Sequence, residues 1–96
     1  FWNPGCGFCQ RLAPEIKEWE SSRSEENPQL VVISTGAADA NREHGFSSTI
    51  LLDQGFRTGG VFGASGTPSA VLIDKDGNVA SSIAVGGPDV MRLLSS

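Results

Sequence analysis

The sequence predicts a single α/β domain with a mixed central sheet flanked by helices, and three observations support this class. Short apolar runs rich in β-branched residues alternate with segments of helical periodicity. Turn-forming residues at 75–78 separate the last two apolar runs, so these should pair as an antiparallel hairpin. The 96 residues suffice for one hydrophobic core but not for two, which predicts one domain over residues 1–96.

The composition argues against several classes of function. Hydrophobic residues make up 39% of the chain and charged residues 19%, a balance that is not typical of disordered proteins. The chain has 11 Asp and Glu against 7 Lys and Arg, so it lacks the basic excess that nucleic-acid binding requires. The longest apolar runs, at 30–33 and 70–73, are far too short to cross a bilayer.

The first expected element is a helix that starts beside the cysteines. Its apolar residues recur at spacings of four, four and three, which places them on one helix face: Phe8, Leu12, Ile16 and Trp19. Pro14 lies inside the same segment, where its missing N–H should kink the helix or divide it into two short helices.

The remaining elements alternate along the chain. Strands are expected at residues 29–34 and 49–53, helices at 37–44 and 56–62, the hairpin strands at 69–74 and 79–85, and a final helix at 89–94. The run at 30–33 is apolar without interruption, which predicts a strand buried on both faces.

Pro88 and His44 have simple structural interpretations. Pro88 suits the first turn of the final helix, whose inward face should carry Val90, Leu93 and Leu94. His44 precedes a glycine at an expected helix C-terminus, where its charge would favour the helix without a catalytic role.

Cys6 and Cys9 are the only cysteines, and their C-x-x-C spacing suits a reversible dithiol or half of a metal site. A disulfide between them would close a very short loop, so it would contribute little stability by constraining the unfolded chain. A structural zinc site needs four ligands, and the chain offers only two cysteines and His44 toward it. We therefore expect no metal, although binding of Cu(I) by the thiolates of Cys6 and Cys9 is an alternative that the sequence leaves open.

The position of the two cysteines on the expected helix predicts different roles for them. Cys6 lies at the helix N-terminus, where unpaired N–H groups and the helix dipole favour a thiolate. Cys9 lies one turn further in and should be more shielded. We therefore expect Cys6 to attack a substrate disulfide and Cys9 to resolve the mixed disulfide.

Two segments that border expected strands, at the start of the chain and before residue 69, raise further expectations. The chain has no initiator Met and opens on Phe1-Trp2, which reads as the end of a strand whose beginning lies outside this sequence. Further along the chain, Thr67 and Pro68 directly precede the strand at 69–74, and a proline is tolerated at the entrance of a strand. The local sequence alone favours a trans bond before Pro68.

Taken together, these residues resemble the thioredoxin superfamily. The segment WNPGCGFC at 2–9 resembles its active-site turn, and GTPSAVLIDKDG at 66–77 resembles its cis-proline loop, strand and hairpin turn. The sequence pattern is most similar to that of the TlpA-like thiol–disulfide oxidoreductases, and the resemblance extends from residue 1 to about residue 94. The resemblance implies a thioredoxin-like fold, here N-terminally truncated, in a protein that is extracytoplasmic and often membrane-tethered.

The resemblance also implies roles for individual residues. Cys6 would be the attacking and Cys9 the resolving cysteine, with no cofactor beyond them. Pro68 would be cis and lie against the disulfide, which leaves the Thr67 backbone free to pair with a substrate strand. Trp2 would form one wall of the site, and packing in the hydrophobic core at the end of a strand is an equal alternative for its role. Gly7-Phe8 replaces the Gly-Pro of thioredoxin, so thioredoxin's reduction potential does not transfer to this chain.

The expected function is thiol–disulfide exchange with protein substrates, in a direction that the sequence leaves open. A membrane-bound redox partner or fusion would supply or remove electrons. The strand edges left exposed by a missing strand would invite self-association with a second copy. Two alternatives stay open: a redox-inactive binding module that presents the groove at 66–68, and a metal-binding dithiol protein.

Overall fold

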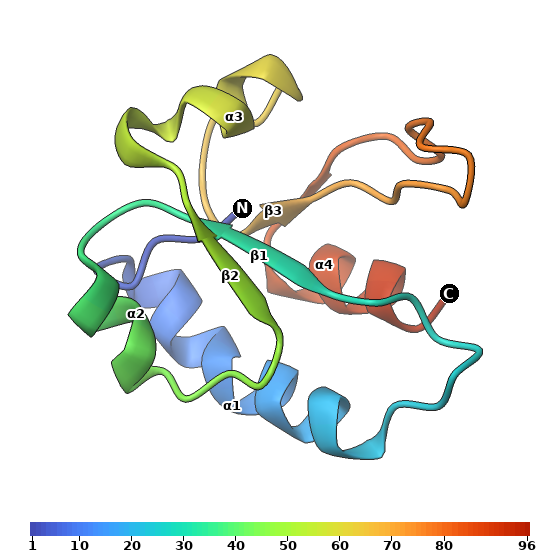
Figure 1. The fold of residues 1–96 in the computed structure, drawn as a ribbon, viewed down its shortest axis with the longest axis horizontal. Helices are drawn as coiled ribbons and strands as arrows, with labels where there is room; N and C mark the ends of the chain where they lie inside the picture. The colour runs from blue at the N-terminus through green and yellow to red at the C-terminus, as the bar shows by residue number, and fades with distance from the viewer.

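The computed structural model describes all residues from Phe1 to Ser96, and its elements follow in α/β order (Figure 1). The helices are α1 (Gly7–Ser22), α2 (Ala38–Glu43), α3 (Arg57–Val61) and α4 (Gly87–Leu94), and a 3-10 turn, η1 (Gln54–Phe56), precedes α3. The strands are β1 (Val31–Ser34), β2 (Thr49–Leu52), β3 (Ser69–Ala70) and β4 (Ala84–Val85). This succession confirms the predicted α/β class.

The sheet consists of two strand pairs that the first two residues join. β1 pairs with β2 in parallel, and β3 pairs with β4 antiparallel. Trp2 forms a parallel bridge with Ser34, while the Phe1 amino group and carbonyl oxygen each bond to the main chain of Ser69, at 2.6 and 3.2 Å. The order is therefore β2, β1, Phe1-Trp2, β3, β4, and the N-terminus lies where β1 and β3 approach each other (Figure 1).

The hydrophobic core lies between this sheet and the adjacent helices α1 and α4, which pack against each other (Figure 1). Its fully buried members come from both helices and from the sheet: Trp2, Cys9, Leu12, Ala13, Ile16, Val32, Val90 and Leu94. Leu93, predicted to face inward with Val90 and Leu94, is only half-buried. Because α1 carries Cys9 and begins directly after Cys6, its packing in this core fixes the position of both cysteines.

Helix α1 differs in two ways from the helix that the sequence predicts. It runs without interruption through Pro14, whose side chain is exposed, so the predicted division into two helices is wrong. Phe8 is 66% exposed, so its predicted place on the buried face is also wrong. The buried face centres on Cys9, Leu12 and Ile16, about a quarter of a turn away from Phe8.

The predicted strands are shorter or less buried than expected. β3 and β4 have two residues each, and the rest of the hairpin pairs only through the bridge between Ile73 and Val79. The Ser81 hydroxyl accepts the Leu72 N–H at 2.9 Å and so takes the place of a main-chain ladder bond. β1 is not buried on both faces as predicted, because the exposed fraction alternates along it and Val31 remains 46% exposed.

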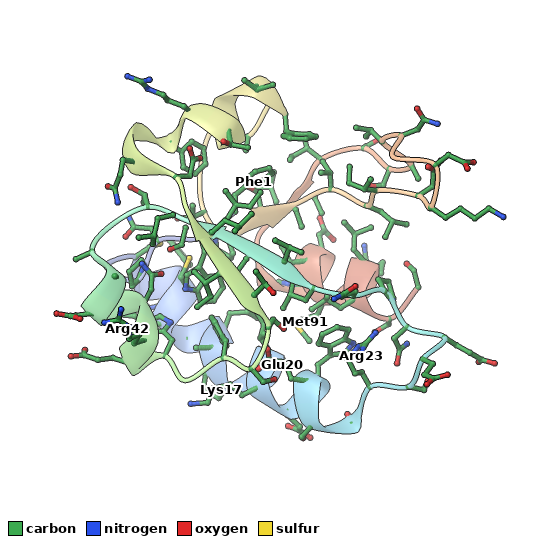
Figure 2. All side chains as sticks on the ribbon, viewed as in Figure 1. Phe1, Lys17, Glu20, Arg23, Arg42 and Met91 are labelled. Carbon is green, nitrogen blue, oxygen red and sulfur yellow. The ribbon has the colours of Figure 1, made fainter.

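An apolar groove of about 340 Å³ separates the two halves of the sheet beyond Phe1. Its walls are residues 28–33 and 68–73, and Ile16, Val90 and Leu94 form its floor. We call it the central groove. The label in Figure 2 marks Phe1 at the centre of the molecule, where the residue lines this groove.

None of the four helices combines the length and the apolar character that crossing a membrane requires.

Candidate active site

Cys6 occupies the N-cap position of α1. Its backbone is extended, with φ −84° and ψ 127°, and the helix proper begins at Gly7. No side chain caps this helix end and no acidic residue lies in the first turn, so nothing neutralises the positive end of the helix dipole there. The half-buried Cys6 thiol thus lies where a thiolate is favoured.

The turn before α1 is held by three hydrogen bonds. The Cys6 N–H donates to the Asn3 carbonyl at 3.0 Å, and the Gly5 N–H donates to Asn3 Oδ1 at 2.9 Å. Gln10 reaches back from α1 and donates through Nε2 to the Pro4 carbonyl at 2.9 Å. The position of Cys6 is therefore fixed from both sides, by the turn and by the helix.

The two thiols have opposite electrostatic environments. Hydrogen bonding with the Thr67 side chain and with the Cys9 backbone lowers the pKa of Cys6 below that of an ordinary cysteine. Burial raises the pKa of Cys9, which has no exposed surface. Both cysteines are free thiols in this structure. One thiol is thus accessible and easily ionised, and the other is inaccessible and held protonated.

The loop before β3 meets the cysteines from across the chain. The Cys6 thiol donates to the Thr67 carbonyl oxygen with a separation of 3.6 Å. The Thr67–Pro68 peptide bond is cis, so the trans geometry favoured by the local sequence is wrong. Ser69 Oγ donates to the Gly66 carbonyl at 2.8 Å and closes the loop. Four of the five residues singled out in the sequence, Cys6, Cys9, Thr67 and Pro68, come from these two neighbouring segments.

Trp2, the fifth residue, lies beneath the site in the hydrophobic core. It is 3% exposed, which favours the packing alternative that the sequence left open. Its ring meets those of His44 and Phe46 edge-on, with centroid separations of 5.8 and 5.3 Å. Its indole Nε1 donates to His44 Nδ1 at 3.2 Å. The sequence contains no local signal for this bond, because 42 residues separate its two partners.

A second contact that sequence reasoning missed lies on the outer face of α1. The Arg11 guanidinium stacks over the ring of Phe8, 4.8 Å from its centroid. The spacing of three residues on a helix could have indicated this pair. Phe8 thereby presents an exposed aromatic ring between the two cysteines in sequence.

The side chains around the cysteines supply few ligands for a metal. No group of three or more His, Cys, Asp and Glu side chains lies close enough together to hold an ion.

The sequence is similar to curated thiol–disulfide enzymes, although no family model matches it. The chain is 25% identical over 88 residues to the thiol-disulfide oxidoreductase ResA of Bacillus thuringiensis (strain Al Hakam), covering 86% of this chain and 51% of that protein. ResA of Bacillus anthracis matches equally well. This chain is also 35% identical over 65 residues to protein disulfide-isomerase A6 of Homo sapiens, which covers 68% of this chain and 13% of that protein. The chain thus spans about half the length of ResA.

Two solved structures share the fold over almost the whole chain. One, assigned as the thiol:disulfide interchange protein DsbE of Chlorobium tepidum, has a TM-score of 0.74 at 20% identity, covering 98% of this chain and 76% of that one. The other, assigned as a thioredoxin of Neisseria meningitidis, has a TM-score of 0.76 at 27% identity, covering 99% and 67%. The predicted thioredoxin-like fold is confirmed. The similarities to ResA in sequence and to the two solved structures in fold together support a TlpA-like protein of the thioredoxin superfamily.

Proposed function

We propose that this chain carries out thiol–disulfide exchange with protein substrates through Cys6 and Cys9. The observation that carries the proposal is the contrast between the two thiols. Cys6 is accessible at a helix N-terminus with a lowered pKa, whereas Cys9 is fully buried one turn further in. A nucleophile must be accessible and ionised, while a resolving thiol has only to reach its neighbour.

The reaction has two steps in the reducing direction. The Cys6 thiolate attacks one sulfur of a substrate disulfide, forms a mixed disulfide and releases the other substrate sulfur as a thiolate. Cys9 then gives up its proton and attacks Cys6 Sγ, which forms the Cys6–Cys9 disulfide and releases the second substrate thiolate. Two electrons pass to the substrate, and its two thiolates take up two protons from water, which balance those that Cys6 and Cys9 have given up. The same steps in reverse oxidise a substrate dithiol.

The loop at 66–68 is the proposed docking point for the substrate backbone. Thr67 lies against the attacking sulfur, and its N–H and C=O make no main-chain hydrogen bond within the fold. An extended substrate segment can therefore pair with Thr67 in the manner of an added strand. Pro68 is buried and shapes this loop, while Trp2 supports the site from within the core.

The proposed partners follow from the family and from the surface. The family resemblance supports an extracytoplasmic setting, with a membrane-bound redox partner or a fused membrane segment that supplies or removes electrons. Cell fractionation tests this setting, and native protein that cycles its thiols in the cytosol would contradict it.

Self-association along the edge strand β2 is also proposed. Leu51 and Leu52 are 52% and 48% exposed there, and exposed strand edges pair readily with other chains. Sedimentation velocity should reveal a dimer. A monomer that unfolds cooperatively would exclude this association.

The reduction potential of the cysteine pair tests the exchange function and gives its direction. The protein is equilibrated with glutathione buffers, and its free thiols are counted by mass spectrometry after alkylation. A value near about −270 mV would make it a reductant like thioredoxin, and one near about −120 mV an oxidant. A pair that stays locked in one state over the whole range would overturn the proposal in favour of a redox-inactive binding module.

Two cysteine variants test the assignment of roles. Cys9→Ser should accumulate a mixed disulfide with substrate proteins, because Cys6 can still attack and nothing resolves the product. Cys6→Ser should form no such adduct, since the remaining thiol has no access to solvent. Adducts on Cys9 in the Cys6→Ser variant would reverse the assignment.

A further inference from the structure

The aromatic contact between Trp2 and His44 points to a positioning role for a residue outside the cysteine site. The Trp2 indole N–H donates to His44 Nδ1 at 3.2 Å, and the two rings meet at 88°. Phe46 packs edge-on against both rings, with centroid separations of 5.3 and 5.7 Å. Trp2 is nearly inaccessible, and His44 and Phe46 are half-buried. The hydrogen bond is therefore shielded from solvent on the side of Trp2.

This hydrogen bond defines the protonation state of the histidine. An imidazole nitrogen accepts a hydrogen bond only when it carries no proton, so neutral His44 must hold its proton on Nε2. The imidazolium ion carries a proton on both nitrogens and has no acceptor left. Protonation of His44 would set two N–H groups against each other and break the bond to Trp2.

Helix α2 holds His44 rigidly on one side of this bond. His44 is the C-cap of α2, and the helix is anchored by the buried side chain of Asn41. Asn41 Nδ2 donates to the carbonyls of Thr35 and Ala37 at 3.2 and 2.9 Å, and Asn41 Oδ1 accepts the Ser34 hydroxyl. The helix that carries His44 is therefore tied to the end of β1.

Trp2 connects this fixed point to the active-site turn on the other side. The backbone N–H of Trp2 donates to the Ile33 carbonyl at 2.9 Å, and the Trp2 carbonyl accepts the Thr35 N–H at 3.0 Å. The next residue, Asn3, holds the turn by accepting the N–H groups of Gly5 and Cys6. Trp2, which bonds to His44, is therefore joined through one residue to the backbone turn that places the Cys6 sulfur.

We propose that His44 is a positioning residue for the Cys6 turn, acting through its hydrogen bond to Trp2, and that protonation of His44 releases this restraint. The inference rests on the proposed exchange function and adds a regulatory contact to the same site. Histidine is the side chain that ordinarily changes charge between about pH 5 and 8.

Few charged groups surround the imidazole. Lys17 of α1 has its ammonium beside Gly45, the residue that follows His44. Arg42 and Glu43 precede it on α2, and Arg42 is engaged by Asp39 at 2.7 Å. Trp2 and Phe46 meet the imidazole with their aromatic rings, and the Glu20 carboxylate of α1 accepts the N–H groups of Ser47 and Ser48 directly after Phe46.

Two variants separate the hydrogen bond from the charge. His44→Asn keeps an acceptor oxygen close to the position of Nδ1 and does not titrate, whereas His44→Phe keeps a ring and removes the acceptor. Both are made in a Trp19→Phe background, so that Trp2 is the one remaining indole in the chain. The readouts are Trp2 fluorescence and the rate of exchange with oxidised glutathione, each measured from about pH 5 to 8. Exchange rates are divided by the fraction of Cys6 that is thiolate, taken from its alkylation by iodoacetamide.

At the upper end of the range, His44→Asn should react as fast as the parent and His44→Phe about two- to ten-fold more slowly, the range expected for one lost hydrogen bond. As the pH falls, the corrected rate and the Trp2 emission of the parent should change together, while those of His44→Asn should not. Identical pH profiles for the parent and His44→Asn would overturn the proposal, even if His44→Phe fails to fold.

A failure of the proposed function would be visible separately. In that case the parent would not exchange with oxidised glutathione although iodoacetamide still modifies Cys6. The positioning role is then decided by Trp2 emission and by the alkylation rate of Cys6. A pH-dependent difference between the parent and His44→Asn in both would support it, and its absence in either would refute it.

Discussion

The sulfur of Cys6 lies 3.6 Å from the carbonyl oxygen of Thr67, although 61 residues separate the two in the chain. The contact joins the N-terminus of α1 to the loop that enters β3. It places a group that can pair with an extended peptide directly beside the nucleophile. In the proposed exchange reaction, attack on a disulfide and capture of the segment that carries it would therefore take place at one point of the surface.

The different pKa values of the cysteines predict the order in which they are alkylated. The thiolate is the reactive form, and the pKa of Cys6 is lowered while that of Cys9 is raised. Iodoacetamide should therefore modify Cys6 at a pH well below the ordinary cysteine pKa of about 8.5, with Cys9 unmodified. Mass spectrometry of the reduced protein after timed labelling measures this order. In denaturant the two should react alike, and earlier labelling of Cys9 in the native protein would contradict the structure.

The Thr67 side chain has a predicted effect on the reactivity of Cys6. Its hydrogen bonding is the largest cause of the lowered Cys6 pKa. Thr67→Val keeps the branched shape and removes the hydroxyl, so the alkylation profile of Cys6 should move to higher pH. Ser65→Ala, an exposed position in the same loop, serves as the matched control and should leave the profile in place. Equal profiles for all three proteins would show that the hydroxyl does not matter.

Asp53 should make the fold sensitive to acid. Its carboxylate accepts the N–H groups of Thr58 and Gly59 at 3.0 to 3.2 Å, and the bond from Thr58 is the main reason that its pKa is lowered. A lowered folded pKa means that the carboxylate stabilises the fold above its ordinary pKa of about 3.9, and that this contribution disappears as the pH falls through the folded value. Asp53→Asn should therefore be less stable than the parent in urea at neutral pH.

The pH dependence of that difference is the diagnostic part. The difference in stability between the parent and Asp53→Asn should shrink in acid, where protonation makes the parent carboxyl neutral like the amide of the variant. Asp39→Asn is the control, because Asp39 is exposed and paired only with Arg42 on the surface of α2. A constant difference between the parent and Asp53→Asn at every pH would rule out the charge as its cause.

Leu12 should contribute strongly to stability because it joins the two helices of the core. It is 4% exposed, and its side chain packs against the first residue of α4, Gly87. Leu12→Ala should lower the free energy of unfolding in urea by about 2 to 5 kcal/mol. Val61→Ala, at a position 84% exposed, should change it by no more than about 0.5 kcal/mol. Similar losses for both variants would mean that the contact between α1 and α4 does not limit stability.

The parts of the molecule that local rules govern could be predicted from the sequence. The helix that starts after Cys6 and the shielding of Cys9 depend only on periodicity and on distance from a helix end. The succession of strands and helices likewise follows from short-range patterns. Phe8 shows the limit of these rules, because periodicity groups apolar residues near one helix face but does not indicate which of them the rest of the fold covers.

Features that depend on distant segments could not be predicted. The bond between Trp2 and His44 exists because α2 packs beside the start of the chain, which no spacing in the sequence encodes. The geometry of the bond before Pro68 is also a property of the assembled fold. The hairpin strands end early because the Ser81 side chain takes up the Leu72 N–H, a choice that a strand pattern does not reveal.

The central groove has a consequence for the exchange of amide hydrogens with solvent. Trp2 bonds to the Ile33 carbonyl and Phe1 bonds to Ser69, so by the alternation of strands the N–H groups of Ile33 and Val71 point into the groove. In deuterated water these two amides should exchange far faster than those that point toward a paired strand. Protection in this sheet is thus interrupted at its middle, where a continuous sheet would be the slowest to exchange.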